Sequence, residues 1–435
     1  MPTPKRWHVI ASAVTLLLAG TPAVTASAGP ADTDRAGHGR AVWAGSWAAA
    51  VTRGNTVGLT NTGLNDQSIR MTVQTTVGGD RLRVRLTNLY GEQAVKVGHA
   101  TVARPDAATD DRSDIDPATV RELTFQGSPS ATINKGAELL SDPLTFPVDE
   151  QEDLVVTLYF PVLTGPVSFH GQSRTTTFIG GTDLTTAVTS PEFTRRVDCC
   201  WMFLSGIDVE RRLSPGSVVV LGDSIGDGNG STVNADRRWP DLLAARLIDA
   251  RPEARTPGVL NLSLSGNRLN HEGTEPGAGD FPGYYELGPN ALARLNEDVF
   301  PQTGVRTLIT HLGINDIWMN GDSAEAIIAS LRQINQQARE RGLTSLVGTI
   351  TPYEGNGGPG VWTEEKEATR QAVNSWLRGA GRAEFDGVLD FDAVLRDPAR
   401  PSRLLPAYDA GDHIHPNDAG AQAMANAVPL RLLGL

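Results

Sequence analysis

The stretch Ser-Val-Val-Val-Leu-Gly-Asp-Ser-Ile, residues 217–225, decides the fold of the second half of this chain. Its apolar run predicts a buried strand, and the Gly-Asp-Ser that follows predicts a loop at the carboxyl end of that strand. Open α/β sheets place their sites at this edge. Ser224 is therefore a candidate nucleophile, with Asp223 beside it in a supporting role.

A second stretch, Asp-His-Ile-His-Pro-Asn at residues 412–417, supplies the partners that a serine nucleophile needs. A serine hydroxyl is activated when an imidazole takes its proton, and a carboxylate orients that imidazole. Asp412 stands close enough to His415 in the sequence for this role. The order serine, aspartate, histidine predicts a hydrolase.

The tripeptide Gly-Asp-Ser occurs again at residues 321–323, so the letters alone do not define a site. No predicted strand precedes this second copy, and the helical run Ala-Glu-Ala-Ile follows it. Asp322 or Ser323 is expected to be the N-cap of that helix. Ser224 differs from this second copy because it directly follows a predicted strand.

Two further loops are expected at the same edge of the sheet, at residues 261–267 and 311–316. Attack on an ester carbonyl creates an oxyanion, which needs hydrogen-bond donors that are fixed in advance. The candidate donors are the backbone N–H groups of Ser224 and Gly266 and the side-chain amide of Asn315.

The apolar periodicity divides the chain into two parts. Residues 68–77, 81–86 and 154–160 alternate apolar and polar side chains between turn-forming clusters, which predicts an all-β sandwich over residues 41–213. After residue 213, strand and helix patterns alternate, which predicts a parallel sheet flanked by helices over residues 214–435. The expected strands are 217–221, 258–262, 306–312, 345–350 and 386–390, and the expected helices are 238–250, 323–341, 363–378 and 417–433.

The amino-terminal residues have the pattern of an export signal. Lys5 and Arg6 precede an apolar stretch at 9–20, and Ala-Ser-Ala at 26–28 is a small-x-small cleavage pattern. We expect a signal peptide at residues 1–28 cleaved near Ala28, a flexible lead at 29–40, and a secreted protein. The apolar stretch is too short to span a bilayer, so no stable membrane insertion is expected.

Composition excludes some partners. A net charge of −12 and a pI near 5.2 argue against nucleic acid as a partner. No cluster of histidine, cysteine and carboxylate residues has the spacing of metal ligands, so neither a metal nor another cofactor is expected. The sequence leaves the oligomeric state open.

The only two cysteines, Cys199 and Cys200, are neighbours. Export permits disulfides, but adjacent cysteines join only through a strained ring. Two packed thiols beside residues 201–203 are therefore expected, with a disulfide between the neighbours as the alternative.

These blocks resemble the SGNH hydrolase superfamily, also called GDSL. That family's pattern is Gly-Asp-Ser, a loop glycine, Gly-x-Asn-Asp and Asp-x-x-His-Pro, and it falls here on Ser224, Gly266, Asn315, Asp412 and His415. The resemblance covers residues 216–435. It implies a flavodoxin-like sheet, Ser224 as nucleophile, His415 as base, Asp412 as its orienter, and an oxyanion hole formed by Ser224, Gly266 and Asn315.

Two details qualify this resemblance. Gly226 stands where the family frequently has threonine, and His413 is not expected to be the base, because the family base is the histidine before proline. Gly222-x-Ser224-x-Gly226 also matches the nucleophile elbow of α/β-hydrolases, but that fold places its acid and its histidine on different loops.

A looser resemblance concerns the substrate. Residues 226–232, 238–240 and 407–412 look like the xylan-esterase-like branch of the superfamily, and the β-rich first half looks like the amino-terminal domains of some carbohydrate esterases. This implies hydrolysis of short-chain esters, acetyl first, of a small molecule or a polysaccharide. The candidate sugar contacts, each with core packing as the alternative, are Trp239, Tyr353 and Tyr408.

Two other functions stay open from the sequence. One is a lipase or phospholipase-type acylhydrolase. The other is a carbohydrate-binding module whose hydrolase domain is vestigial.

Overall fold

The computed structural model describes residues 41–109, 112–250, 255–275, 287–358 and 360–433. The expected signal peptide at 1–28 and the lead at 29–40 lie outside these residues. The described residues form one compact unit. Within the described part of the chain, no helix is both long enough and apolar enough to cross a membrane.

A five-stranded parallel sheet organises the α/β half, here residues 214–433. Its strands, in spatial order, are β18 (Gly258–Asn261), β17 (Ser217–Gly222), β19 (Val305–His311), β20 (Thr344–Gly348) and β21 (Gly387–Leu389). Chain order 2-1-3-4-5 is the flavodoxin-like arrangement. The run Val-Val-Val-Leu of β17 is buried, as expected for a strand of a sheet with helices on both faces, and β17 pairs in parallel with β18 and β19, so the expected α/β fold is confirmed.

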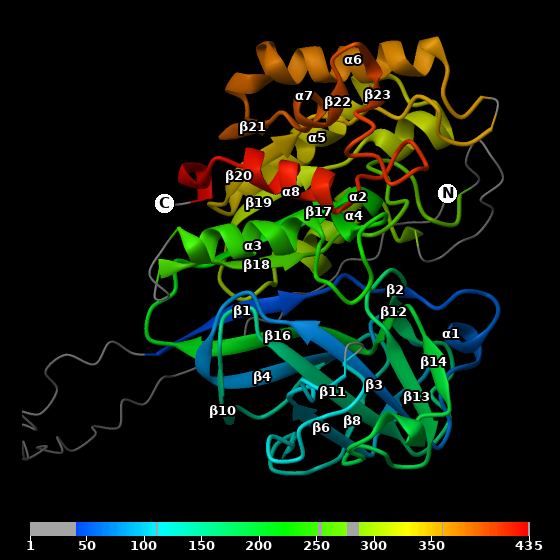
Figure 1. Ribbon diagram of the computed structural model, residues 1–435, viewed down its shortest axis with the longest axis vertical. Coiled ribbons are helices and arrows are strands. Elements are labelled where there is room, and N and C mark those ends of the chain that lie inside the picture. Colours follow the sequence, from blue (N-terminus) through cyan, green and yellow to red (C-terminus); the bar gives the residue numbers. More distant parts are fainter. Residues whose placement is uncertain (1–40, 110–111, 251–254, 276–286, 359, 434–435) are drawn as a thin grey trace, which may run out of the picture. The chain divides into compact units, whose positions relative to one another are not determined.

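Four longer helices pack around this sheet (Figure 1). They are α3 (Trp239–Asp249), α5 (Ala324–Glu340), α6 (Glu364–Arg378) and α8 (Asp418–Ala427). Side chains cap three of their amino ends, because Ser323, Thr363 and Asn417 each accept a backbone N–H of the first turn. The helix expected at 417–433 is too long, since it ends at Ala427 just before Pro429, whose ring prevents continuation.

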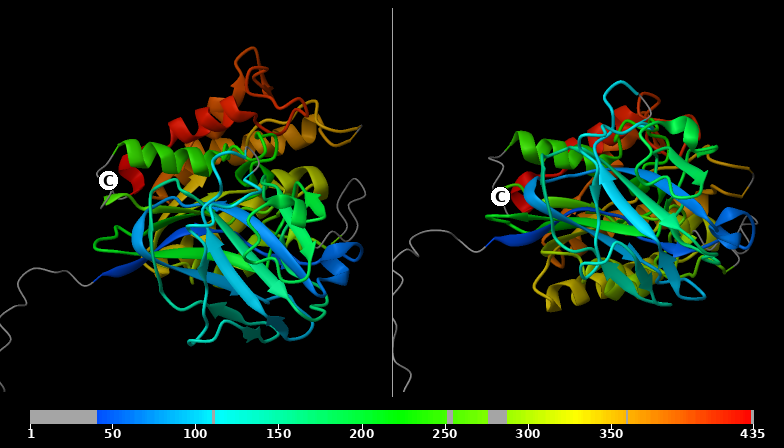
Figure 2. Two further views of the ribbon diagram at one scale, coloured as in Figure 1. Left: turned by 60° about the horizontal axis from the view of Figure 1, so that its bottom comes forward. Right: turned by 90° about the horizontal axis from the view of Figure 1, so that it is seen from below.

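Antiparallel sheets form the β-rich half, here residues 41–213 (Figure 2). One large sheet contains β1 (Val42–Ala48), β16 (Leu204–Arg211), β4 (Gly79–Thr87), β10 (Leu144–Val148) and β9 (Glu138–Leu140). The other contains β14 (Arg195–Val197), β13 (Thr177–Gly181), β3 (Gln67–Gln74), β11 (Asp153–Phe160), β6 (His99–Ala103) and β7 (Arg121–Glu122). Leu82 and Val84 of β4 share one core with Ile69 and Met71 of β3, as in a sandwich.

A small antiparallel sheet matters most for the site. It joins β15 (Trp201–Met202), β12 (Ser168–His170) and β2 (Thr52–Arg53), and His170 pairs with Trp201.

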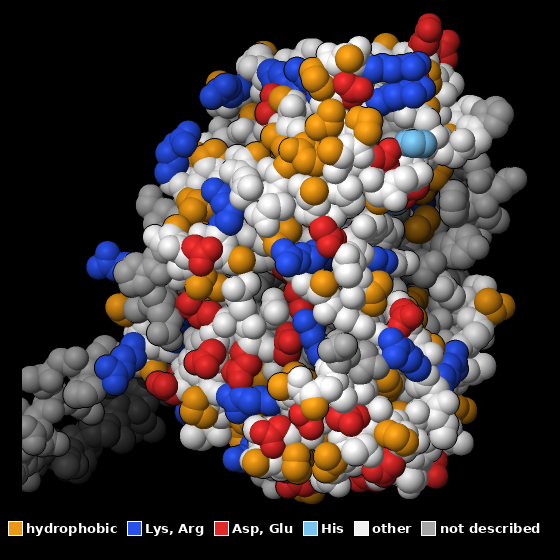
Figure 3. All heavy atoms as spheres, in the orientation of Figure 1, with side chains coloured by type: hydrophobic (Ala, Val, Ile, Leu, Met, Phe, Trp, Pro, Cys, Tyr) orange, Lys and Arg blue, Asp and Glu red, His pale blue; other side chains and the backbone are white. Residues whose placement is uncertain are grey.

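Hydrogen bonds connect the two halves at several points. The backbone N–H of Gly45 donates to the carbonyl oxygen of Thr303 at 3.1 Å, and that of Val259 donates to Oγ1 of Thr76 at 3.0 Å. A domain boundary between residues 213 and 214 stays a prediction. On the face drawn in Figure 3, basic and acidic side chains are interspersed.

The expectation of two free thiols is wrong, because Cys199 and Cys200 form a disulfide. Cys200 has a φ of 84°, in the left-handed region, and this turn before β15 brings the two neighbouring sulfurs together. The sulfur of Cys200 also lies 3.9 Å from the carbonyl oxygen of Gly171.

Candidate active site

Ser224 stands where β17, an interior strand of the parallel sheet, ends. The chain leaves β17, and Asp223 caps the short helix α2 (Ser224–Asp227) by accepting the backbone N–H of Ile225 at 3.0 Å. This abrupt change from strand to helix places the side chain of Ser224, which is 6% exposed, at the carboxyl edge of the sheet.

A chain of hydrogen bonds joins Ser224 to the loop before α8. Nε2 of His415 lies 2.7 Å from Oγ of Ser224, and Nδ1 of His415 lies 2.5 Å from Oδ2 of Asp412. The other carboxylate oxygen of Asp412 accepts the backbone N–H of His415 at 2.9 Å, so one carboxylate holds both the ring and the backbone of the histidine. Asn356 donates to the carbonyl oxygen of Asp412 at 2.9 Å and anchors this loop.

Asp412 is held in its ionised form. Partial burial alone would raise the pKa of this carboxyl, but the hydrogen bond and charge of His415 and the backbone N–H of Ile414 outweigh burial and lower the pKa to about 2. A stable carboxylate beside Nδ1 fixes the ring orientation and favours the imidazolium that forms when His415 takes a proton from Ser224.

Gly266 lies on the loop after β18 and has a φ of 76°. A Cβ at this position would stand 2.3 Å from Cδ2 of Leu287. Both facts exclude a side chain here, so the backbone of Gly266 approaches the site directly.

Asn315 follows β19 and is 2% exposed. Its Oδ1 accepts the indole N–H of Trp318 at 2.7 Å, and its Nδ2 donates to the carbonyl oxygen of Asn267 at 3.0 Å. The indole bond fixes which end of the amide is the donor end, and an amide nitrogen carries a second hydrogen. Asp316 accepts the backbone N–H groups of Leu269 and Asn270 and holds the neighbouring loop.

Asn315→Ala is expected to lower kcat by about a hundredfold or more with KM nearly unchanged, because the donor acts on charge that develops in the transition state. Trp318→Phe keeps an aromatic ring but removes the N–H that orients the amide, so it should also lower kcat, by less than Asn315→Ala does. Steady-state kinetics on one ester measure both changes. An unchanged kcat in Asn315→Ala would remove this amide from the oxyanion hole.

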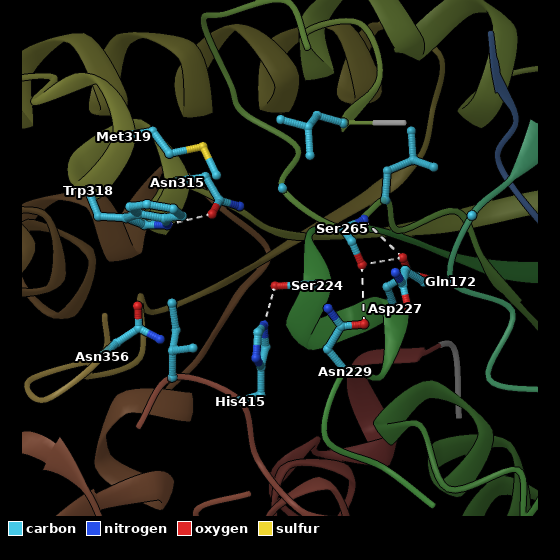
Figure 4. Close-up of a pocket in the computed structure, with 15 residues that line it drawn as sticks. Gln172, Ser224, Asp227, Asn229, Ser265, Asn315, Trp318, Met319, Asn356 and His415 are labelled. Atoms are coloured by element: carbon cyan, nitrogen blue, oxygen red, sulfur yellow. Dashed lines mark hydrogen bonds between the residues drawn. The ribbon is translucent and has the colours of Figure 1, made fainter. Parts of the chain in front are cut away.

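One pocket of about 450 Å³ collects these groups (Figure 4). Ser224, His415, Gly266 and Asn315 all line it. The rest of its wall combines apolar and polar side chains, namely Leu264, Leu287, Trp318, Met319, Ile414, Gln172, Asp227, Asn229, Ser265 and Asn356, with the backbone of Gly171. The arrangement suits acyl transfer, since a nucleophile, a base and oxyanion donors face one cavity.

Asp223 is buried beneath the nucleophile, and its burial raises its pKa to about 7. The negative charges of Asp316 and Asp227 add to this rise, whereas the N–H of Ile225 opposes it.

The raised pKa of Asp223 predicts a pH dependence of stability. The ordinary pKa of an aspartate is 3.8, so between about pH 4 and pH 7 the folded protein holds a proton on Asp223 that the unfolded chain releases. The stability contributed by this group is therefore complete below about pH 4 and is lost as the pH rises through about 7. Asp223→Asn should flatten that decline in urea unfolding measured between pH 4 and 8. Equal slopes for both proteins would show that Asp223 is ionised in the fold.

The structure separates the other sequence candidates from the pocket. Ser323 caps α5 by accepting the N–H of Ala326 at 3.3 Å, as expected. Nδ1 of His413 lies 2.6 Å from Oδ2 of Asp409, and its side chain is half exposed. Trp239 and Tyr353 are fully buried and Tyr408 is half-buried, all in the core of the α/β half rather than in the pocket wall, so the alternative of core packing holds.

A group that the sequence spacing did not indicate consists of His271, Asp316 and Asp322, whose ligand-type atoms lie within 4.8 Å of one another. Nε2 of His271 lies 2.8 Å from Oδ1 of Asp322, and both oxygens of Asp316 accept backbone N–H groups. These protein contacts account for the cluster, and the absence of a metal requirement stays a prediction.

Several pocket residues were missed from the sequence. Trp318 and Asp227 each stand three positions after a recognised residue, on the same helical turn, which is a signal that helical spacing could have provided. Gln172, by contrast, comes from the β-rich half, and nothing in its local sequence indicates a site.

A comparison with protein-family models agrees with this reading of the α/β half. Residues 220–423 match the model of the GDSL-like Lipase/Acylhydrolase family. No curated protein matches the chain. Among solved structures, a GDSL-like lipase from Bacteroides thetaiotaomicron is 15% identical, with a TM-score of 0.37, over 50% of this chain and 88% of that one. A family two carbohydrate esterase from Clostridium thermocellum is 11% identical, with a TM-score of 0.37, over 88% of this chain and 98% of that one.

Proposed function

We propose that this chain, of which residues 220–423 match the GDSL-like lipase/acylhydrolase family, is a serine esterase that cleaves short acyl esters, acetyl first, of carbohydrates through an acyl-enzyme. The observation that carries the mechanism is the hydrogen-bonded series Ser224–His415–Asp412 at the edge of the pocket. A carbohydrate-binding module with a vestigial hydrolase is disfavoured, because the side chains for catalysis stand within bonding distance.

The proposed reaction has two halves. Nε2 of His415 takes the proton of Ser224 while Oγ attacks the ester carbonyl, and the oxyanion receives hydrogen bonds from Asn315 Nδ2 and the N–H groups of Gly266 and Ser224. His415 returns the proton to the departing alcohol, which leaves an acyl-serine. Water, deprotonated by His415, then attacks this ester and releases the acid and free Ser224.

The pocket supports a small substrate with hydroxyl groups. Its volume of about 450 Å³ lies in the lower part of the range for ligand sites. Side chains that both donate and accept hydrogen bonds, Gln172, Asn229 and Asn356, lie in its wall, and such groups pair with the hydroxyls of a polyol.

A lipase-type acylhydrolase is the second candidate. Leu264, Leu287 and Met319 give the same pocket an apolar side that would also accept a longer acyl chain. The two candidates differ in the length of acyl group that they favour.

Acyl length decides between them. Each methylene that finds no room costs about 1 kcal/mol or more, so kcat/KM on p-nitrophenyl esters should fall steeply beyond about four carbons. Acetate should be released from acetylated xylan or another acetylated glycan. A preference for chains of about eight carbons or more, with no acetate released from any glycan, would move the assignment to lipase.

Export belongs to the same proposal. The signal pattern at residues 1–28 supports it, and so does the Cys199–Cys200 disulfide, because disulfides persist mainly in oxidising compartments.

A further inference from the structure

A buried chain of polar contacts runs from the β-rich half to the loop that carries Gly266. His170, the last residue of β12, is 1% exposed. Its Nδ1 lies 2.9 Å from the carbonyl oxygen of Ala50, and its Nε2 lies 2.8 Å from Oδ1 of Asp227. A carboxylate oxygen only accepts, so Nε2 of His170 donates to Asp227, and the contacts of the two ring nitrogens tie α2 to the β-rich half.

Asp227 continues this chain toward the oxyanion hole. It belongs to the same short helix as Ser224 and is also 1% exposed. Its Oδ2 accepts both the backbone N–H and the hydroxyl of Ser265, at 2.9 and 2.8 Å (Figure 4). Ser265 directly precedes Gly266, so the peptide that carries the Gly266 N–H starts from an anchored residue.

The β-rich end of the chain is itself firmly held. The ring of His170 packs on Trp201 at a centroid distance of 5.2 Å, and the indole N–H of Trp201 donates to the carbonyl oxygen of Thr72 at 2.9 Å. Gly171 and Gln172, which directly follow His170 in the sequence, line the pocket. The β-rich half therefore contributes two residues to the wall of the pocket, and its His170 contacts the buried carboxylate of Asp227.

We propose that His170 is a positioning residue for catalysis, which fixes the Gly266 N–H in the oxyanion hole through Asp227 and Ser265. The inference rests on the proposed esterase function. Without His170, Asp227 is a buried carboxylate that lacks one of its donors, and such a group shifts or recruits water. A small displacement of an oxyanion donor lowers the rate without changing how the ground-state ester binds.

The test compares His170→Phe with His170→Gln in the full chain. Phenylalanine keeps a ring that can pack on Trp201 but cannot donate, whereas glutamine retains a donor for Asp227. We expect His170→Phe to lower kcat by roughly tenfold or more with KM within about twofold. The inhibition constant of a boronic acid, whose adduct with Ser224 places an oxygen in the oxyanion hole, should rise in parallel. His170→Gln should recover part of both losses.

Thr303→Val is the matched control. Oγ1 of Thr303 is also a polar link between the halves, bonded to Arg85 at 2.5 Å and to Asp208 at 2.9 Å, and it lies outside the pocket wall. This variant should lower the melting temperature without changing kcat or boronate affinity. A double-variant cycle of His170→Gln with Ser265→Ala should give a combined loss smaller than the product of the single losses.

Failure of the role of His170 and failure of the esterase function give different results in these experiments. A folded His170→Phe protein with wild-type kcat, or with only KM changed, would overturn the role of His170. If His170→Phe does not fold, the cycle of His170→Gln with Ser265→Ala decides instead: a combined loss equal to the product of the single losses would overturn the role of His170. A wild-type protein that hydrolyses no ester would overturn the proposed function itself.

Discussion

Replacing Ser224 by alanine is expected to reduce ester hydrolysis by several orders of magnitude, since the variant has no nucleophile to form the acyl-enzyme. The fold should be little affected, because Ser224 begins a short helix after β17 and the change removes one hydroxyl, whose hydrogen-bond partner is His415. Steady-state kinetics and thermal unfolding of the same preparation measure both effects.

The duplicate tripeptide provides the control for this prediction. Ser323→Ala removes only the N-cap of α5 and should cost about 1 kcal/mol of stability with activity retained. An inactive Ser323→Ala protein beside an active Ser224→Ala protein would show that the wrong Gly-Asp-Ser had been chosen.

Replacing His415 by alanine should cause a loss of activity of similar size, because Nε2 of His415 lies 2.7 Å from Oγ of Ser224 and is placed to take its proton. A base must be neutral to accept a proton, so wild-type activity should be low in acid and should rise with pH to a plateau. The pH profile of kcat/KM measures this limb.

His413 gives a control only two positions away. It pairs with Asp409 at the surface, so His413→Ala should keep both the rate and the pH limb. Substantial activity in His415→Ala with an unchanged profile would show that another base serves Ser224.

Buried apolar runs made the fold predictable from sequence. Each expected strand of the parallel sheet lies within about two residues of an observed one, because strands of a sheet that is covered on both faces carry buried apolar runs. The helix over 417–433 was overextended, since apolar periodicity continues past Pro429 although the backbone does not. The disulfide was missed because ring strain was weighed without the left-handed φ of Cys200.

The site was predictable only where local spacing reports it. Asp412 and His415 contact each other within one loop, and strand ends bring Ser224, Gly266 and Asn315 to one edge. The contact between His170 and Asp227 joins residues 57 positions apart in different halves of the chain, so no local pattern indicates it. Long-range polar contacts of this kind depend on packing that a single sequence does not display.

Covalent labelling tests the assignment of Ser224 as the nucleophile. A fluorophosphonate phosphonylates an activated serine and stops at a stable adduct, so incubation followed by peptide mass spectrometry identifies the nucleophile. We expect a single phosphonyl group on the peptide that contains Ser224, with activity lost in proportion to labelling and no label in the Ser224→Ala protein. Complete inhibition with the label on another residue, or ester hydrolysis that persists when Ser224 is fully labelled, would contradict it.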